Sequence, residues 1–273
     1  MVITILVDNI SHDEKLKAEW GLSFHISYKG HNILLDAGDS SAFAENADEL
    51  GIDVSKVDIA VLSHGHHDHG DGFGEFCRRN PHCPVYIRDE VNENIYKLRE
   101  EGYCYLGLAL DVLNQLEGQA KRVKGELDIA EGIHILPHST PNLKMLGKRE
   151  NMFIKSGRLF KPDDFRHEHS LVIENEDNDG ITVFNSCSHA GAYNIIDEVT
   201  KAFPDKPIKA YLGGLHLFNK TDEEVLQFAN LVKERQVGHI YTGHCTGDHA
   251  FELLKAELGE NIEQFSSGME IRL

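Results

Sequence analysis

Residues 57–72 read VDIAVLSHGHHDHGDG. The first seven residues form a mostly apolar run, which is typical of a buried strand. The run leads into a cluster of imidazoles and one carboxylate, which are ligands for zinc, manganese or iron, and the interspersed glycines let the backbone turn so that these groups converge. Open α/β folds form their sites beyond the carboxyl ends of strands. We therefore predict a metal site here, with the ligands His64, His66, Asp68 and His69.

Two further histidines follow predicted strands in the same way. His189 comes after the strand ITVFN in the turn NSCSHAG, and His244 comes after HIYT in the turn TGHCTG. The recurrence predicts that one shared edge of the sheets supplies six ligands, enough for two metal ions. His216, in GGLHL, has the same setting, and we expect it to line the pocket. Cys187 and Cys245 adjoin the predicted ligands, but small buried thiols are more often packing residues.

The rest of the chain alternates strand and helix patterns in two similar halves, which favours two sheets with helices outside. Runs of β-branched and apolar residues predict strands at 1–7, 23–28, 32–36, 85–88, 133–136, 170–174, 181–185, 208–212, 239–242, 262–266 and 269–273. Helical spacing predicts helices at 40–50, 91–101, 106–118, 195–203, 221–236 and 248–258.

The composition describes one soluble domain. The chain has 273 residues, 41% of them hydrophobic, and a net charge of −18. Such an acidic surface repels a phosphate backbone, so we expect no nucleic-acid partner. No apolar stretch approaches the length of a spanning helix, so we expect no membrane partner. The five cysteines are odd in number and contain no C-x-x-C pair, which favours a reducing cytoplasm.

These motifs resemble the metallo-β-lactamase superfamily, whose hallmark is H-x-H-x-D-H after a strand. Residues 64–69 match it, and an earlier strand ends in Asp36. The segments EWGLS at 19–23, SCSHAG at 186–191, GGLHL at 213–217 and HCTG at 244–247 are similar to the dihydropterin-ribofuranosylaminobenzene phosphate synthase branch. Many members bridge their metals with an aspartate that follows a strand, and Ser186-Cys187-Ser188-His189 holds that place here.

The resemblance implies an α/β fold of the αββα four-layer sandwich type. We expect a single domain spanning residues 1–273, with an inserted helical or lid region at about 90–165. It also implies two divalent metal ions in a groove between the sheet edges, with zinc as the first expectation and manganese or iron as alternatives. Asp36 is expected to accept a hydrogen bond from a ligand histidine and so fix its tautomer.

The predicted chemistry is hydrolysis by a metal-bound hydroxide, with Asp68 both ligating and orienting the nucleophile. Residues 144–166 carry seven basic and three acidic residues in an otherwise acidic chain. We expect this segment, through Lys148 and Arg149, to attract a small anionic ester, lactone, thioester or phosphoester. A solvated charged face would have the same composition.

Three other functions remain open from the sequence. A non-hydrolytic transferase of the synthase type would use the same ligands. A di-iron redox protein is a third candidate, because His and carboxylate ligands also suit iron. The similar redox proteins, however, usually carry a carboxylate at the position that His66 occupies here. A metal-binding or sensing module would keep the ligands without turnover. The oligomeric state is not determined by the sequence.

Overall fold

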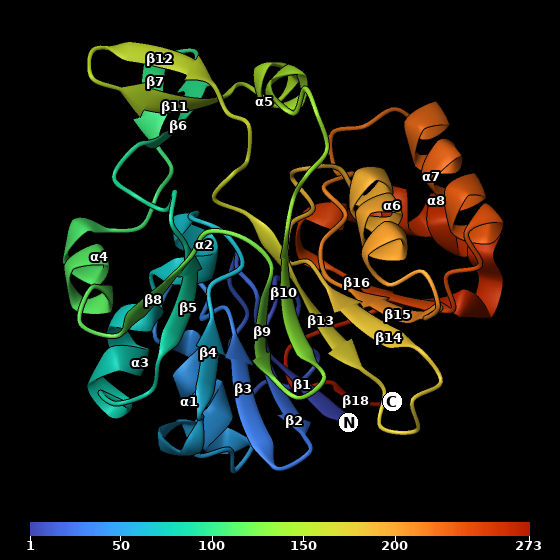
Figure 1. Ribbon diagram of the computed structural model, residues 1–273, viewed down its shortest axis with the longest axis horizontal. Helices are drawn as coiled ribbons and strands as arrows, with labels where there is room; N and C mark the ends of the chain where they lie inside the picture. Colours follow the sequence, from blue (N-terminus) through green and yellow to red (C-terminus); the bar gives the residue numbers. More distant parts are fainter.

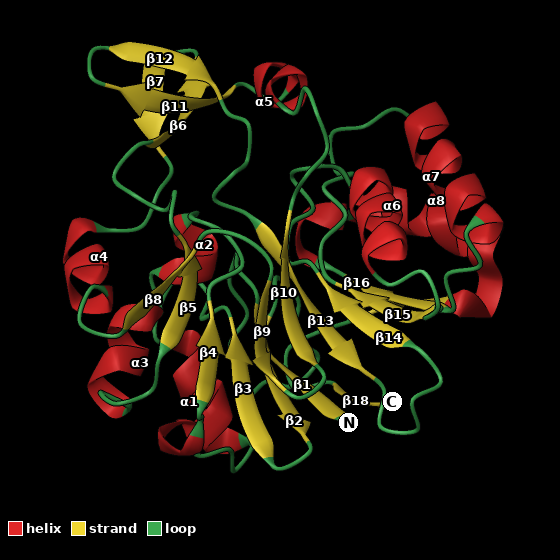
Figure 2. Cartoon of the chain, viewed as in Figure 1, coloured by secondary structure: helices red, strands yellow, loops and turns green.

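The computed structural model describes residues 1–273, and two seven-stranded sheets form its centre (Figures 1 and 2). The first sheet has the order β18-β1-β2-β3-β4-β5-β8. Within this sheet, β2 and β3 form a hairpin whose turn contains Lys29 and Gly30. Both residues have positive φ angles, as the tight two-residue hairpin turns that favour Asn and Gly require. The strands are β1 (Val2–Val7), β2 (Ser23–Tyr28), β3 (His31–Leu35), β4 (Ile59–Val61), β5 (Val85–Arg88), β8 (Ala120–Val123) and β18 (Glu270–Arg272).

The second sheet comes mainly from the later half of the chain and has the order β17-β16-β15-β14-β13-β10-β9. Its strands β14, β15 and β16 run parallel to one another, so their carboxyl ends reach the same edge. The strands are β9 (Leu127–Ala130), β10 (Ile133–Pro137), β13 (His169–Glu174), β14 (Ile181–Phe184), β15 (Ile208–Leu212), β16 (His239–Thr242) and β17 (Ile262–Gln264).

Helices cover the outer face of each sheet (Figure 2). Against the first sheet lie α1 (Ala42–Glu49), α3 (Phe73–Arg79) and α4 (Leu110–Leu116), and against the second lie α6 (Ala192–Ala202), α7 (Asp222–Glu234) and α8 (Asp248–Leu258). The helix α7 begins with a capping box, in which the Thr221 hydroxyl accepts from Glu224 N and the Glu224 carboxylate accepts from Thr221 N. Short 3-10 turns occupy Val54–Lys56, His244–Thr246 and Gly259–Asn261.

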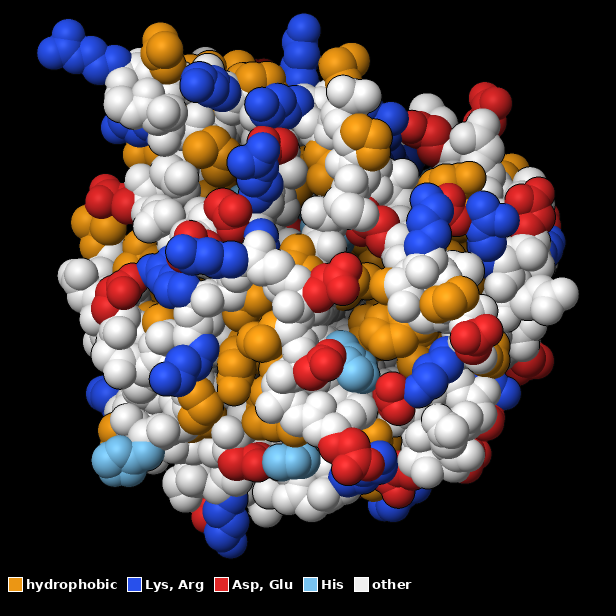
Figure 3. Space-filling view, viewed as in Figure 1, with side chains coloured by type: hydrophobic (Ala, Val, Ile, Leu, Met, Phe, Trp, Pro, Cys, Tyr) orange, Lys and Arg blue, Asp and Glu red, His pale blue; other side chains and the backbone are white.

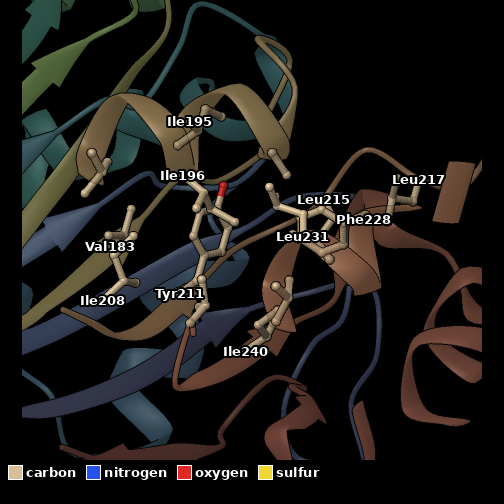
Figure 4. Close-up of a cluster of buried hydrophobic side chains, with 14 of the residues drawn as sticks. Val183, Ile195, Ile196, Ile208, Tyr211, Leu215, Leu217, Phe228, Leu231 and Ile240 are labelled. Carbon is tan, nitrogen blue, oxygen red and sulfur yellow. The ribbon is translucent and has the colours of Figure 1, made fainter. Parts of the chain in front are cut away.

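Three hydrophobic cores separate these four layers. One lies between the two sheets and includes Phe24 and Phe184, whose rings meet edge to face. A second packs the first sheet on its helices, and the third packs the second sheet on α6, α7 and α8. Figure 4 shows the third core, where Tyr211 of β15 lies beneath Ile195 and Ile196 of α6. The predicted αββα sandwich is thus confirmed.

The region at 90–165 differs from the helical insertion that the sequence predicts. Residues 91–101 form no helix: β6 (Ile95–Arg99) pairs with β7 (Gly102–Tyr105), and β11 (Met152–Ser156) and β12 (Leu159–Pro162) complete a small antiparallel sheet of order β12-β11-β6-β7. Tyr96 lies opposite Tyr105 and Phe153, and this aromatic face stabilises the strands. Between β7 and β11, the chain returns to the two main sheets and forms β8, β9 and β10.

The small sheet stands at the end of the molecule where the strands of β4 and β5 finish, beside α5 (Lys144–Arg149) (Figure 1). In Figure 3, Lys and Arg side chains gather over this upper part of the face. All five cysteines are free. No helix has both the length and the apolar character that crossing a membrane requires.

Candidate metal centre

The histidine-rich loop begins where β4 ends and passes directly into the short helix α2 (His67–Gly70). Its backbone packs tightly against the loop after β3, because a methyl group at Gly72 would lie 1.9 Å from the carbonyl oxygen of Ala37. Only glycine fits at that position. His67, which the prediction leaves out, turns toward Asp39 and is partly exposed. The four predicted ligands are all buried: His64, His66, Asp68 and His69.

The other three predicted histidines follow the parallel strands β14, β15 and β16 and therefore reach one edge of the second sheet. Each of their loops contains a non-glycine residue in the left-handed region: Ser188 at φ 57°, His216 at φ 50° and His244 at φ 47°. Such a conformation costs about 1–3 kcal/mol and persists only where the surrounding structure enforces it, which is common at functional sites.

The six predicted ligands meet as two groups of three, which we call the first and the second triad. In the first group, His64, His66 and His189 offer ring nitrogens that all lie within 4.8 Å of one another. In the second group, the same limit holds for Asp68, His69 and His244. His69 Nε2 lies 3.1 Å from His244 Nε2, and His244 Nε2 lies 3.5 Å from an oxygen of Asp68. Each group joins a residue of the β4 loop to a histidine more than 100 positions away.

The chemistry of the first group suits a cation. His66 Nε2 and both ring nitrogens of His189 are buried without a protein partner, and such orphaned polar atoms are costly unless a ligand satisfies them. Burial, reinforced by the neighbouring imidazoles, lowers the pKa of His64, His66 and His189 well below the usual value. Neutral imidazoles are the form that binds metal. The residues present therefore fit a metal ion.

Asp36 is linked to both groups of candidate ligands, directly to His69 and through Ser63 to His64. Its carboxylate accepts hydrogen bonds from Ser63 N at 2.7 Å and Ser63 Oγ at 2.6 Å, and lies 2.8 Å from His69 Nδ1. Ser63 Oγ in turn lies 2.8 Å from His64 Nδ1. Burial alone would lower the pKa of His69, but the carboxylates of Asp68 and Asp36 outweigh it and raise the pKa to about 9. Asp36 thus directs His69 Nε2 toward the centre.

Cys187, which the sequence suggests is a packing residue, lies in direct contact with a candidate ligand. Its sulfur is 3.2 Å from His69 Nε2 and 3.5 Å from the sulfur of Cys245. It belongs to one group of potential ligands with His64 and His69 and to another with His244 and Cys245. The thiol therefore stands near members of both triads. The signal in the sequence was the position of Cys187 directly after a strand.

A pocket of about 550 Å³ opens beside the first triad, and His189 and His216 form part of its wall. His216 is buried, and neither of its ring nitrogens has a hydrogen-bond partner. The remaining wall comes mainly from α5, the start of α6, the loop after β15 and one side of α7. The apolar members of the wall are Leu146, Ala192, Tyr193, Leu215, Leu217, Phe228 and Leu231.

The basic segment reaches this pocket at one predicted position and not at the other. Arg149 lines the pocket and pairs with Glu224 at 2.7 Å, whereas Lys148 is exposed on α5 outside the wall. A second cation in the wall, Lys220, forms an ion pair with Glu150. Most of the remaining basic side chains belong to β11, β12 and the loops beside them, and none of these side chains lines the pocket.

Two further buried groups, His167 and Glu168, lie near the first triad, and sequence reasoning missed the first of them. His167 Nδ1 accepts a hydrogen bond from Gly65 N at 3.2 Å, and its ring stacks on His64. Glu168 accepts hydrogen bonds from the backbone N–H groups of His189 and Ala190. Both come immediately before β13, and their position at a strand end was the available signal.

Comparison with known proteins agrees with this geometry. The family model described as the metallo-beta-lactamase superfamily matches residues 21–144. Together with the four-layer fold, this match shows that the chain is similar to the metallo-β-lactamase superfamily over residues 21–144.

Particular relatives cover almost the whole chain. The crystal structure of Tm1679, a metal-dependent hydrolase of the β-lactamase superfamily, superposes with a TM-score of 0.85 at 27% identity, covering 100% of this chain and 99% of that one. The 7,8-dihydropterin-6-methyl-4-(beta-D-ribofuranosyl)-aminobenzene-5'-phosphate synthase of Methanocaldococcus jannaschii is 25% identical, covering 99% of this chain and 96% of that relative. A diphosphatase of the PhnP family shares the fold, with a TM-score of 0.57 at 15% identity and coverage of 100% of this chain and 97% of that one.

Proposed function

We propose that this protein is a metal-dependent hydrolase that acts on a small anionic ester, lactone, thioester or phosphoester. The observation that carries the proposal is the convergence of two triads of metal-binding side chains, the first of which contributes His189 to the wall of a 550 Å³ pocket. One divalent cation would be held by His64, His66 and His189, and another by Asp68, His69 and His244. When bound, such cations supply Lewis acidity and a nucleophile at neutral pH.

The donor set favours zinc. Imidazole nitrogens and a carboxylate suit zinc, manganese and iron, and the nearby sulfur of Cys187 adds a soft donor that favours zinc or iron over manganese. Manganese would draw instead on oxygen donors, and Asp68 is the one carboxylate within the two triads. We therefore propose two zinc ions as the cofactors.

The side chains around the pocket have separate roles in this proposal. Asp68 would accept a hydrogen bond from the attacking water and orient it. His216 borders the pocket, and its ring nitrogens have no hydrogen-bond partner although Nε2 lies 3.7 Å from Glu150, so it can hydrogen-bond the substrate. Arg149 would attract the anionic group of the substrate. The apolar wall would contact the remaining part of the substrate and exclude water.

The deciding experiment is metal analysis of protein purified without chelators, followed by assays on a panel of ester, thioester and phosphodiester substrates. We expect about two metal equivalents per chain, from the two triads. His66→Ala removes one imidazole of the first triad, and we expect loss of both a metal equivalent and activity. A wild-type protein that binds no divalent metal would contradict the proposal.

A second candidate is a non-hydrolytic transferase. It is favoured by the similarity over nearly the full chain to the methanogen synthase named above. Both reactions would use the same centre, so metal content does not separate them. A product assay does: hydrolysis incorporates oxygen from labelled water into a product, whereas transfer moves a group from one substrate to another, releases the leaving group of the first and incorporates no label.

A further inference from the structure

The two histidines that are most distant from the β4 loop share an unusual backbone contact. His189 N donates to Glu168 Oε1 at 2.9 Å, and the next amide, Ala190 N, donates to Glu168 Oε2 at 2.9 Å. His244 N donates to Asp8 Oδ1 at 2.9 Å. Both carboxylates are almost completely excluded from solvent, at 1% and 0% exposure. A buried carboxylate thus holds each loop through the backbone N–H of its candidate ligand histidine.

Burying a carboxylate is expensive unless hydrogen bonds or a cation compensate it, so these two contacts are not incidental packing. Glu168 also lies 2.8 Å from His138 Nε2. Asp8 accepts a second backbone bond, from Ile10 N at 3.2 Å. Both contacts sit beside strained backbone, at Ser188 and at His244 itself, where a loop held less firmly would relax.

The two carboxylates come from different elements and serve different triads. Of the two histidine loops, Glu168, which precedes β13, contacts that of His189, and Asp8, which follows β1, contacts that of His244. We propose that Glu168 and Asp8 are positioning residues that fix the backbone of one distant histidine each, so that the two metal positions are organised independently. This inference rests on the metal centre of the proposed function.

A carboxylate is required because both of its oxygens accept. Replacing Glu168 with Gln keeps the volume but turns one acceptor into an NH₂ group, which then faces the N–H of His189 or Ala190. Replacing Asp8 with Asn has the same effect on the N–H of His244 or Ile10. Each substitution therefore releases one loop without removing a ligand side chain.

The test is zinc titration of the metal-free, full-length protein. His189→Ala and His244→Ala first establish which binding step belongs to which triad. Glu168→Gln is then expected to weaken only the step that His189→Ala removes, and Asp8→Asn only the step that His244→Ala removes, each by about 10–100-fold, as expected for supporting residues around a metal. A merely structural role would lower thermal stability and weaken both steps together, and that result would overturn the inference.

The matched control is Glu198→Gln. Glu198 is also buried, accepts hydrogen bonds from Ser139 N and Thr140 N, and shares His138 with Glu168, but it has no hydrogen bond to residues 188–190. We expect it to lower stability and leave both zinc-binding steps unchanged. An equal loss of the His189 step in this variant would contradict a local role for Glu168.

Hydrogen exchange of the unmodified protein keeps the inference testable if a variant fails to fold. The amides of His189, Ala190 and His244 should be protected in the absence of metal, because the carboxylates hold them already. Rapid exchange of these amides would overturn the inference. If the wild-type protein binds no zinc, the proposed function fails; if it binds two zinc ions and neither variant is selective, only the present inference fails.

Discussion

Asp36 illustrates how much one side chain can organise. It is fully buried, sits at φ 58° and contacts both Ser63 and His69. The sequence indicates a carboxylate at a strand end, and that pattern suffices to suggest a hydrogen bond to a ligand histidine. It does not indicate that Ser63 extends the contact to His64, because a serine at a strand end carries no distinguishing signal.

Arg149 allows the charge of the substrate to be tested at a single residue. Arg149→Ala removes the guanidinium from the pocket wall, so KM for an anionic substrate should rise by about 10-fold or more, with kcat little changed, as expected for the loss of a charge-assisted hydrogen bond worth about 1.5–3 kcal/mol.

Lys144→Ala serves as the control for that measurement. Lys144 lies on the same helix but outside the pocket wall, 3.8 Å from Asp164. An unchanged KM in Arg149→Ala, or an equal rise in both variants, would show that Arg149 does not bind the anionic group.

Among the elements, the loop after β10, the loop before β13 and α6 are tied together by one buried charge network. His138 lies 2.8 Å from Glu168 and 3.0 Å from Glu198. Burial alone would lower the pKa of His138, but these two carboxylates outweigh it and raise the pKa to about 9. The imidazolium is therefore the stable form in the folded protein.

This network predicts a pH dependence of stability. The folded-state pKa of His138 lies above its ordinary value of 6.5. Its contribution is therefore complete below about pH 6.5 and is lost as the pH rises through about 9; the shift corresponds to roughly 3 kcal/mol. Chemical denaturation of the metal-free protein should show a difference in unfolding free energy between wild type and His138→Gln that is largest near pH 6. A difference that grew toward pH 10 would refute this assignment.

The small sheet shows where local patterns mislead. Residues 91–101 have helical spacing of apolar positions, yet Ile95–Arg99 forms a strand. The helix loses because Tyr96 and Leu98 can pack on Tyr103, Tyr105 and Phe153 only from extended backbone, and these partners lie on other strands. Tertiary packing outweighed a weak local preference.

In the whole molecule, the proposed metal ions would join the two sheets. Each triad combines residues of the β4 loop, on the first sheet, with a histidine that follows a strand of the second sheet. A cation bound there cross-links segments that the hydrophobic core between the sheets already brings together. Metal binding should therefore stabilise the folded state and not the unfolded chain.

Thermal unfolding checks this link. Free metal at 100 times its dissociation constant should add about 2.7 kcal/mol per site, and a chelator should lower the melting temperature accordingly. The double variant His189→Ala/His244→Ala, which lacks one ligand from each triad, should lose most of this dependence on metal. A melting temperature that is insensitive to metal in the wild-type protein would contradict a centre that spans both sheets.

The sequence by itself determined the parts of this protein that depend on local order. A strand followed by small residues and a histidine recurs along the chain, and strands that end at one edge bring such histidines together, which predicts the grouping of His64, His66, Asp68, His69, His189 and His244. The alternation of strands and helices indicates two sheets covered by helices, and the resemblance to a known family implies their αββα order.

Only the tertiary structure decided which of these residues form each triad, that Arg149 and not Lys148 reaches the pocket, and that Cys187, Glu168 and Asp8 stand against the centre. The physical reason is that these contacts join segments far apart in the chain. Their geometry depends on how two sheets pack face to face, and no local pattern encodes that packing.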